Sequence, residues 1–90
     1  MTEATREPHE TRLKRLRMRS MRRGIKEMDL ILAAYADARL HQLGHEALDR
    51  YDALLEENDQ DLYRWVSGQE TPPEHFEPMI DDIVQHGTRA

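Results

Sequence analysis

The stretch that decides the fold is residues 24–40, which read GIKEMDLILAAYADARL. Its apolar side chains recur at three- and four-residue spacing, which is typical of one buried face of an α-helix. The members of this face are Ile25, Met28, Leu32, Tyr35 and Ala36. No part of the chain shows the sustained alternation of β-branched and polar residues that indicates a strand. The sequence therefore predicts an all-α fold, with one helix running from Gly24 to about Leu40.

The same reasoning, applied outward from this helix, predicts a small five-helix bundle with short loops. Ninety residues form one domain, which buries only about 60–65% of the surface of its unfolded chain. We expect this domain to cover residues 10–86, between flexible tails at 1–9 and 87–90. The other four helices are expected at about 10–21, 45–57, 58–68 and 78–86, with a short turn at 72–76.

Glycine, asparagine and proline mark the predicted helix ends. Gly24 is expected to stop the first helix in the left-handed conformation, and Gly68 to end the fourth helix. Asn58 is expected to cap the start of the fourth helix. Residues 71–74, Thr-Pro-Pro-Glu, have the pattern of a capping box with proline at the first helical position. Pro78 prevents one straight helix through this region, because an interior proline removes a backbone donor.

The remaining apolar side chains predict the core. Trp65 is expected to lie inside it and Tyr63 at its rim, since a domain this small needs its large apolar groups buried. An interface role for Trp65 is the alternative. The other expected contributors are Leu13, Leu16, Leu48, Tyr51, Leu54, Leu55, Leu62 and Val66, with Ser20 on the same side of the first helix.

Charge is distributed very unevenly along the chain. Residues 12–26 hold eight basic side chains and no acidic one, whereas residues 27–90 hold fifteen acidic and four basic side chains. The formal net charge of −5 therefore conceals a basic segment followed by an acidic one. This asymmetry indicates a partner that the basic segment meets.

The sequence contains no recognised pattern of catalytic or metal-binding residues. It has no cysteine, no glycine-rich phosphate loop and no Gly-x-Ser-x-Gly elbow. His41 and His45 lie four residues apart, but Gly44 is expected to break the helix between them, and no third ligand is evident. We therefore predict neither an enzyme nor a metal site.

A candidate contact site lies where the basic segment meets the acidic one. Arg22 and Arg23 follow the negative C-terminus of the first predicted helix, which they would stabilise as part of a solvated helix. They also stand beside the positive N-terminus of the second predicted helix, an arrangement unfavourable by up to about 1 kcal/mol for each side chain. This corner would attract a carboxylate or phosphate of a partner. Glu27 follows Arg23 by four residues and is expected to orient it. Gly24, which has no Cβ, would permit close approach of a partner.

Three blocks of the chain carry a resemblance to a known family. They are residues 19–30, RSMRRGIKEMDL; residues 51–65, YDALLEENDQDLYRW; and Pro72-Pro73-Glu74 followed by the last amphipathic helix. In this order and spacing they resemble the bacterial FAD assembly factor SdhE and its mitochondrial counterpart, succinate dehydrogenase assembly factor 2. The first block is similar to the Arg-Gly-x-x-Glu-Leu-Asp block of that family. The resemblance covers about residues 13–84, and Met21, where many relatives carry an aromatic residue or cysteine, departs from it.

The resemblance implies a five-helix protein that promotes covalent attachment of FAD to a histidine of the succinate dehydrogenase flavoprotein and, in some bacteria, of fumarate reductase. It implies that Arg23, Gly24 and Glu27 form the functional motif, and we expect Arg22, Ser20 and Asp29 to extend this contact. We expect no tightly bound cofactor, because the FAD belongs to the partner. The free chain is expected to be a cytoplasmic monomer without membrane insertion, since its acidic first ten residues are unlike a transit peptide.

Two other functions compete with this interpretation. The basic segment 12–26 could bind nucleic acid, with a steep dependence on salt. The strongly acidic remainder of the chain argues against it, because acidic side chains repel phosphate backbones. An antitoxin-like role, in which the acidic face binds a basic protein, is the second alternative.

Overall fold

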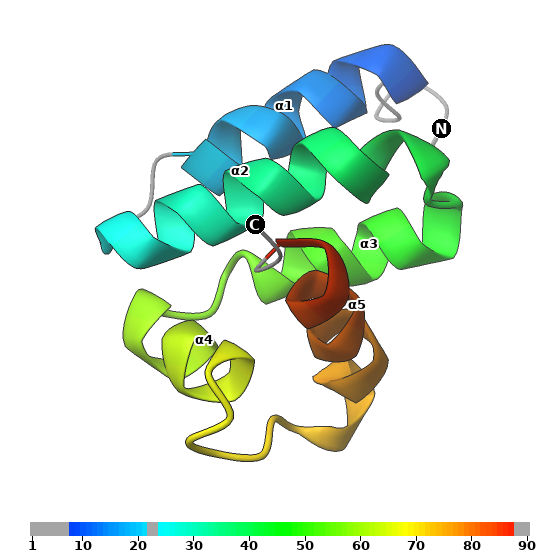
Figure 1. Cartoon of the computed structure of the whole chain (residues 1–90). Helices are drawn as coiled ribbons and strands as arrows, with labels where there is room; N and C mark the ends of the chain where they lie inside the picture. The colour runs from blue at the N-terminus through cyan, green and yellow to red at the C-terminus, as the bar shows by residue number, and fades with distance from the viewer. Residues whose placement is uncertain (1–7, 22–23, 88–90) are drawn as a thin grey trace.

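The computed structural model describes residues 8–21 and 24–87, which form helices joined by short loops (Figure 1). The elements are α1 (His9–Met21), α2 (Lys26–Arg39), the 3-10 helix η2 (Leu40–Gln42), α3 (His45–Leu54), α4 (Asp59–Val66), the 3-10 helix η3 (Glu74–Phe76) and α5 (Glu77–Gly87). No strand occurs in these residues, and the predicted all-α fold of five helices is confirmed. Helical structure includes His9 and Gly87, which lie one residue outside the predicted domain on either side.

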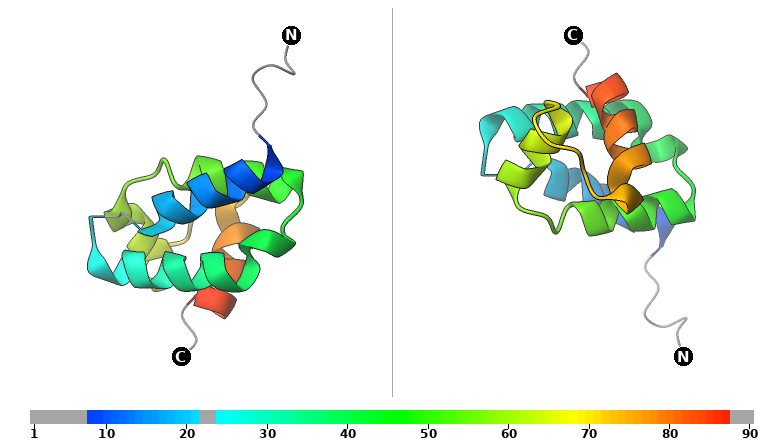
Figure 2. Two further views of the ribbon diagram at one scale, coloured as in Figure 1. Left: turned by 90° about the horizontal axis from the view of Figure 1, so that it is seen from above. Right: turned by 90° about the horizontal axis from the view of Figure 1, so that it is seen from below.

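Helix α2 occupies the middle of the molecule. It lies beside α1, with which it runs antiparallel, and it also contacts α4 and α5 (Figure 1). The views from above and below show that α5 crosses from the side of α3 to the side of α2 (Figure 2). The last turn of α5 therefore meets α2 far from the point where α5 begins.

The predicted buried face of α2 is confirmed. Met28, Leu32 and Tyr35 are fully buried, and Ala36 is nearly so, while Ile25 packs against this core from its edge. Full burial of a leucine or methionine side chain is worth about 1.5–3 kcal/mol, so this face is a main source of stability. The other helices add the predicted residues Leu16, Leu48, Tyr51, Leu54, Leu55, Leu62, Trp65 and Val66, with Leu13 partly buried.

Three of the residues predicted to mark the ends of helices have that role in the structure. Asn58 Oδ1 accepts a hydrogen bond from the backbone N–H of Asp61 at 2.9 Å and caps α4. Gly68 follows α4 with a φ of 85°, the left-handed conformation that glycine adopts without a Cβ clash. Pro78 lies in the first turn of α5, where its missing N–H has no intrahelical partner to lose.

Two predicted ends in the second half of the chain are wrong. The third helix ends at Leu54 rather than at residue 57, because Asn58 must be extended, with a ψ of 156°, to cap α4. Thr71 caps no helix, and helical structure starts only with η3, after Pro73. The physical reason is that a proline disfavours the helical conformation in the residue before it, so Pro73 keeps Pro72 out of a helix.

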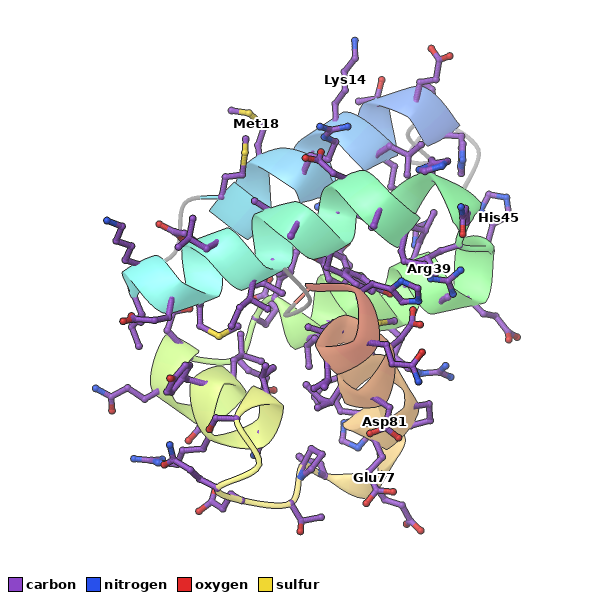
Figure 3. All side chains as sticks on the ribbon, in the orientation of Figure 1. Lys14, Met18, Arg39, His45, Glu77 and Asp81 are labelled. Atoms are coloured by element: carbon purple, nitrogen blue, oxygen red, sulfur yellow. The ribbon has the colours of Figure 1, made fainter. Side chains whose placement is uncertain are left out.

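The arginines of α1 are paired within the chain, so the charge asymmetry of this part of the basic segment also has an explanation inside the fold. Helix α1 faces the acidic side of α3, and long side chains bridge the two helices. These bridges, here called the α1–α3 ion-pair row, are Arg12–Asp49, Arg15–Asp52 at 2.9 Å, Arg19–Asp52 at 2.5 Å and, in the turn just after α3, Arg19–Glu56 at 2.8 Å. Arg17 pairs with Asp37 of α2 at 2.5 Å. Lys14, by contrast, points away from the bundle (Figure 3).

Asp52 is the centre of this row, and its replacement by asparagine tests the contribution of the row to stability. The hydrogen bonds from Arg15, with the charges of Arg15, Arg19 and Arg12, hold the pKa of Asp52 below its ordinary value of 3.8. A folded-state pKa below the unfolded value gives stability that is present above about pH 4 and is lost as the pH falls further. Asp52→Asn should therefore lower the free energy of unfolding by about 0.5–1 kcal/mol at pH 7.

Denaturant unfolding followed by circular dichroism at pH 7 and pH 3 measures this difference. The difference in the free energy of unfolding between wild type and Asp52→Asn should be smaller at pH 3 than at pH 7. Asp81→Asn is the matched control, because Asp81 is exposed and has no salt bridge among the described residues. If this difference in unfolding free energy is the same at both pH values, Asp52 does not act through its charge.

Candidate functional site

The predicted contact residues are distributed around the start of α2. Gly24 and Glu27 are exposed, and Asp29 is partly buried. Arg22 and Arg23 lie outside the described residues, so the orientation of Arg23 by Glu27 stays a prediction. Gly24, Glu27 and Asp29 thus lie on one short segment, but Asp29 follows Glu27 by two positions, about 200° around α2, so the two carboxylates do not share one face of the helix.

Ser20 does not belong to this surface. Its exposed fraction is 0%, its hydroxyl donates to the carbonyl oxygen of Leu16 at 2.7 Å, and its Oγ lies 2.5 Å from the hydroxyl oxygen of Tyr51. Ser20 follows Leu16 by one helical turn, so it shares the buried face of α1. Its side chain links α1 to α3 and is out of reach of a partner, which corrects the prediction for Ser20.

Gly24 fixes the entry of the chain into α2. Its backbone N–H donates to Asp59 Oδ2 at 2.5 Å, which ties this corner to the first residue of α4. A Cβ on Gly24 would lie 3.2 Å from the same oxygen, so the carboxylate would have to shift by a few tenths of an ångström. Helix α1 ends at Met21, and the φ of Gly24 depends on Arg23, which lies outside the described residues, so the predicted left-handed stop stays a prediction. The small size of Gly24 suits the close contact with Asp59.

Glu27 stands at the rim of a hollow with a volume of about 340 Å³, here called the α2–α4–α5 hollow. The hollow is also lined by Leu30 and Ile31 of α2, Tyr63 of α4 and Gly87 of α5. Ile31 and Tyr63 pack against the core, which confirms Tyr63 as a rim residue. Within the described part of the chain, Glu27 has no hydrogen-bond or salt-bridge partner.

Sequence reasoning named none of the other four lining residues as contact candidates, and Leu30 and Gly87 show two different reasons. Leu30 lies two positions after the buried Met28, which places it about 200° around the helix and off the buried face. An apolar residue at such a position is a usable signal, and Leu30 is indeed exposed by 62%. Gly87 gave no such signal, because it was assigned to the C-terminal tail, whereas it is buried at the end of α5.

A second polar cluster fastens α5 to α2. The Tyr35 hydroxyl donates to Asp82 Oδ2 at 2.7 Å, and Arg39 Nε donates to the same oxygen at 3.1 Å. Burial and the carboxylate of Asp82 raise the pKa of Tyr35 well above its ordinary value, so the hydroxyl stays protonated and remains a donor. This cluster has a structural task, since every one of these polar groups is used to join the two helices.

The described residues contain no group of three or more side chains that could hold a metal ion. His41 lies in η2 and His45 opens α3, so the predicted break at Gly44 is confirmed. None of the helices described here has the length and apolar character needed to cross a membrane.

Comparison with known proteins gives a consistent result. Residues 14–87 match the model of the family Sdh5, described as flavinator of succinate dehydrogenase. The chain is 44% identical over 76 residues to the mitochondrial succinate dehydrogenase assembly factor 2 of Aspergillus terreus, covering 84% of this chain and 25% of that protein. It is 36% identical over 73 residues to the protein of that name from Dictyostelium discoideum, covering 81% of this chain and 52% of that protein.

The chain therefore spans between a quarter and about half of the length of these two relatives. The match covers α2, the Arg-Gly-x-x-Glu segment and the three helices that form the α2–α4–α5 hollow. The resemblance drawn from the sequence blocks is confirmed, and the chain belongs to the Sdh5 family, the flavinators of succinate dehydrogenase.

Proposed function

We propose that this chain promotes the covalent attachment of FAD to a histidine of the flavoprotein subunit of succinate dehydrogenase. Membership of the flavinator family supports this function. The structural observation that carries it is the exposed carboxylate of Glu27 at the start of α2, which has no partner in residues 8–21 and 24–87 and lies beside an apolar hollow. Such a combination suits contact with another protein, because it offers both apolar area and a charge that selects its partner.

The chain acts in this proposal by preorganisation rather than by chemistry of its own. Joining FAD to a histidine requires that the two groups be held in a productive arrangement, and holding them so can supply several kcal/mol. The corner between α1 and α2 docks on the flavoprotein and keeps its domains in that arrangement. The Gly24–Asp59 contact keeps the corner rigid, Glu27 binds a cation of the partner, and Arg23 binds an anion.

The FAD in this proposal stays with the flavoprotein. The α2–α4–α5 hollow does not fit the pyrophosphate of a dinucleotide, because the only charged side chain among its lining residues is the carboxylate of Glu27. A carboxylate repels a phosphate, whereas dinucleotide sites use helix N-termini and glycine-rich turns. The flavin supplies the reactive carbon, which is the 8α-methyl group attached to its ring, and the chain handles it only through the partner.

The proposal also covers the location of the chain, its oligomeric state and a second flavoprotein. The chain works as a non-catalytic monomer in the cytoplasm, without inserting into a membrane, and it also serves the flavoprotein of fumarate reductase where that enzyme is present. The relatives from Aspergillus and Dictyostelium are named mitochondrial. Fractionation of cells and size-exclusion chromatography with light scattering test the location and the monomeric state.

Deletion of the gene is the direct test of the function. Protein-bound flavin survives denaturing electrophoresis and fluoresces in the gel, so the flavoprotein band reports covalent attachment. We expect this band to lose most of its fluorescence in the deletion strain while the amount of flavoprotein stays similar. Re-expression of the chain should restore the signal, and an unchanged signal in the deletion strain would refute the proposal.

The nucleic-acid alternative is weakened by the α1–α3 ion-pair row. The three arginines of this row and Arg17 already pair with carboxylates of the same chain, so at most half of the eight basic side chains of the segment remain to release counterions from a phosphate backbone. A pull-down that returns a flavoprotein, rather than nucleic acid or a small basic protein, separates the proposal from both alternatives.

A further inference from the structure

The walls of the α2–α4–α5 hollow are held in place by the core. Ile31 and Tyr63 are partly buried against it, and α5 reaches α2 at Gly87. A Cβ on Gly87 would lie only 2.6 Å from the carbonyl oxygen of Ile31, so the two helices already touch at this point. The hollow is therefore a formed feature of the surface, and a partner group can enter it without an ordering cost in the walls.

Leu30 forms an apolar edge of this hollow, and its side chain is not part of the hydrophobic core. Its exposed fraction is 62%, against 47% for Met18 and 49% for Met21, the other large apolar side chains exposed in the described residues. Single exposed apolar residues are common on protein surfaces. Leu30 differs because it adjoins a hollow that also presents Ile31 and Tyr63, so an incoming apolar side chain would touch all three.

Glu27 adds a charge to the same rim. It precedes Leu30 by three residues, so the two side chains lie on one face of α2. Its carboxylate is exposed and has no partner among the described residues. An unpaired carboxylate beside an apolar hollow favours a cationic neighbour on the ligand and disfavours an anionic one.

From these observations we infer that the hollow receives an apolar side chain of the flavoprotein that is flanked in space by a lysine or arginine. The apolar group packs on Leu30, Ile31 and Tyr63, and the cation pairs with Glu27. This inference rests on the proposed function, and it extends the contact from the Arg-Gly-x-x-Glu segment across α2 to α4 and α5. Apolar packing supplies affinity, and the charge pair supplies orientation and a faster encounter.

Titration of the chain into the purified, FAD-loaded flavoprotein subunit of succinate dehydrogenase from the same organism tests the inference by isothermal calorimetry. Leu30→Asn removes the apolar edge without adding charge and should raise the Kd by about tenfold, as expected for a packed interface side chain. This effect should be nearly independent of salt. Met18→Asn, the same kind of change at an exposed apolar residue of α1 outside the hollow, should leave the Kd unchanged.

The charge is tested separately by Glu27→Gln. At low ionic strength this variant should bind about three- to tenfold more weakly than wild type, and the difference should shrink at 0.5 M salt because salt screens exposed charges. Unchanged binding by Glu27→Gln, or tighter binding by Glu27→Lys, would show that no cation faces the rim.

The outcomes separate this inference from the proposed function. If the wild-type chain binds the flavoprotein and raises its covalent flavin, but Leu30→Asn and Met18→Asn bind with equal Kd, the hollow inference is wrong and the function stands. If the wild-type chain neither binds nor raises covalent flavin, the proposed function is wrong and the inference is lost with it.

Discussion

Replacing Glu27 by alanine is expected to lower stimulation of covalent flavin attachment by about tenfold or more, as truncation of a central interface residue can. The carboxylate is exposed and unpaired among the described residues, so its removal leaves no buried group without a partner. The loss of an acidic side chain from the first turn of α2 costs a few tenths of a kcal/mol through the helix dipole. Attachment should therefore fail while the melting temperature stays close to that of wild type.

The measurement uses purified flavoprotein, FAD and the chain, with in-gel flavin fluorescence followed over time. Glu77→Ala is the matched control, because Glu77 is an exposed acidic residue in the first turn of α5, at the far side of the molecule (Figure 3). It should stimulate normally. On sequence grounds Arg23→Ala should behave like Glu27→Ala. Normal stimulation by Glu27→Ala would rule out a role of this carboxylate in docking.

Replacing Gly87 by alanine is expected to lower the free energy of unfolding by about 1–3 kcal/mol, the usual cost of overpacking. The new Cβ would lie 2.6 Å from the Ile31 carbonyl oxygen, 3.1 Å from Ile31 Cγ2 and 3.3 Å from Tyr35 Cβ. The closest of these is a backbone atom of α2, which cannot rotate away, so the last turn of α5 must move. For a domain of this size the melting temperature should fall by roughly 4 °C or more.

Two other glycines provide controls for this prediction. Gly44 has open space around its Cβ position and an ordinary φ of −79°, so Gly44→Ala should change stability by less than about 0.5 kcal/mol. Gly68 also has open space but a φ of 85°, so Gly68→Ala should cost about 1–2 kcal/mol through backbone strain alone. Thermal melts of the three variants distinguish a steric clash from strain, and equal effects at Gly44 and Gly87 would contradict the clash.

The sequence was sufficient for features that depend on neighbouring residues. The spacing of Met28, Leu32 and Tyr35 predicts the buried face of α2 because the period of a helix is fixed by backbone geometry. Asn58 and Gly68 act within a single turn, so their roles also follow from local chemistry. Thr71 shows the limit of such rules, because the restriction that Pro73 imposes on Pro72 overrides the capping pattern.

Features that depend on residues far apart in the chain could not be predicted in this way. The basic segment was assigned to a partner because a charge count does not show that Arg15 and Arg19 face Asp52 across two helices. The burial of Ser20 follows from its spacing after Leu16, but its contact with the Tyr51 hydroxyl joins two helices and no local pattern reveals it. The α2–α4–α5 hollow likewise exists only because three helices converge, although the outward position of Leu30 was already encoded in the helical period.

The contact of Gly87 with Ile31 has a consequence for the order in which the molecule acquires its binding capacity. These residues lie 56 positions apart in the chain, and contacts between distant residues carry a large loop-closure cost and tend to form late in folding. Helices α1 and α2 are neighbours in the chain and can pair early, but the hollow is incomplete until α5 has docked. A nascent or truncated chain that lacks the last turn of α5 would thus display Gly24 and Glu27 without the complete hollow, and under the proposed function engagement of the flavoprotein would await synthesis of that turn.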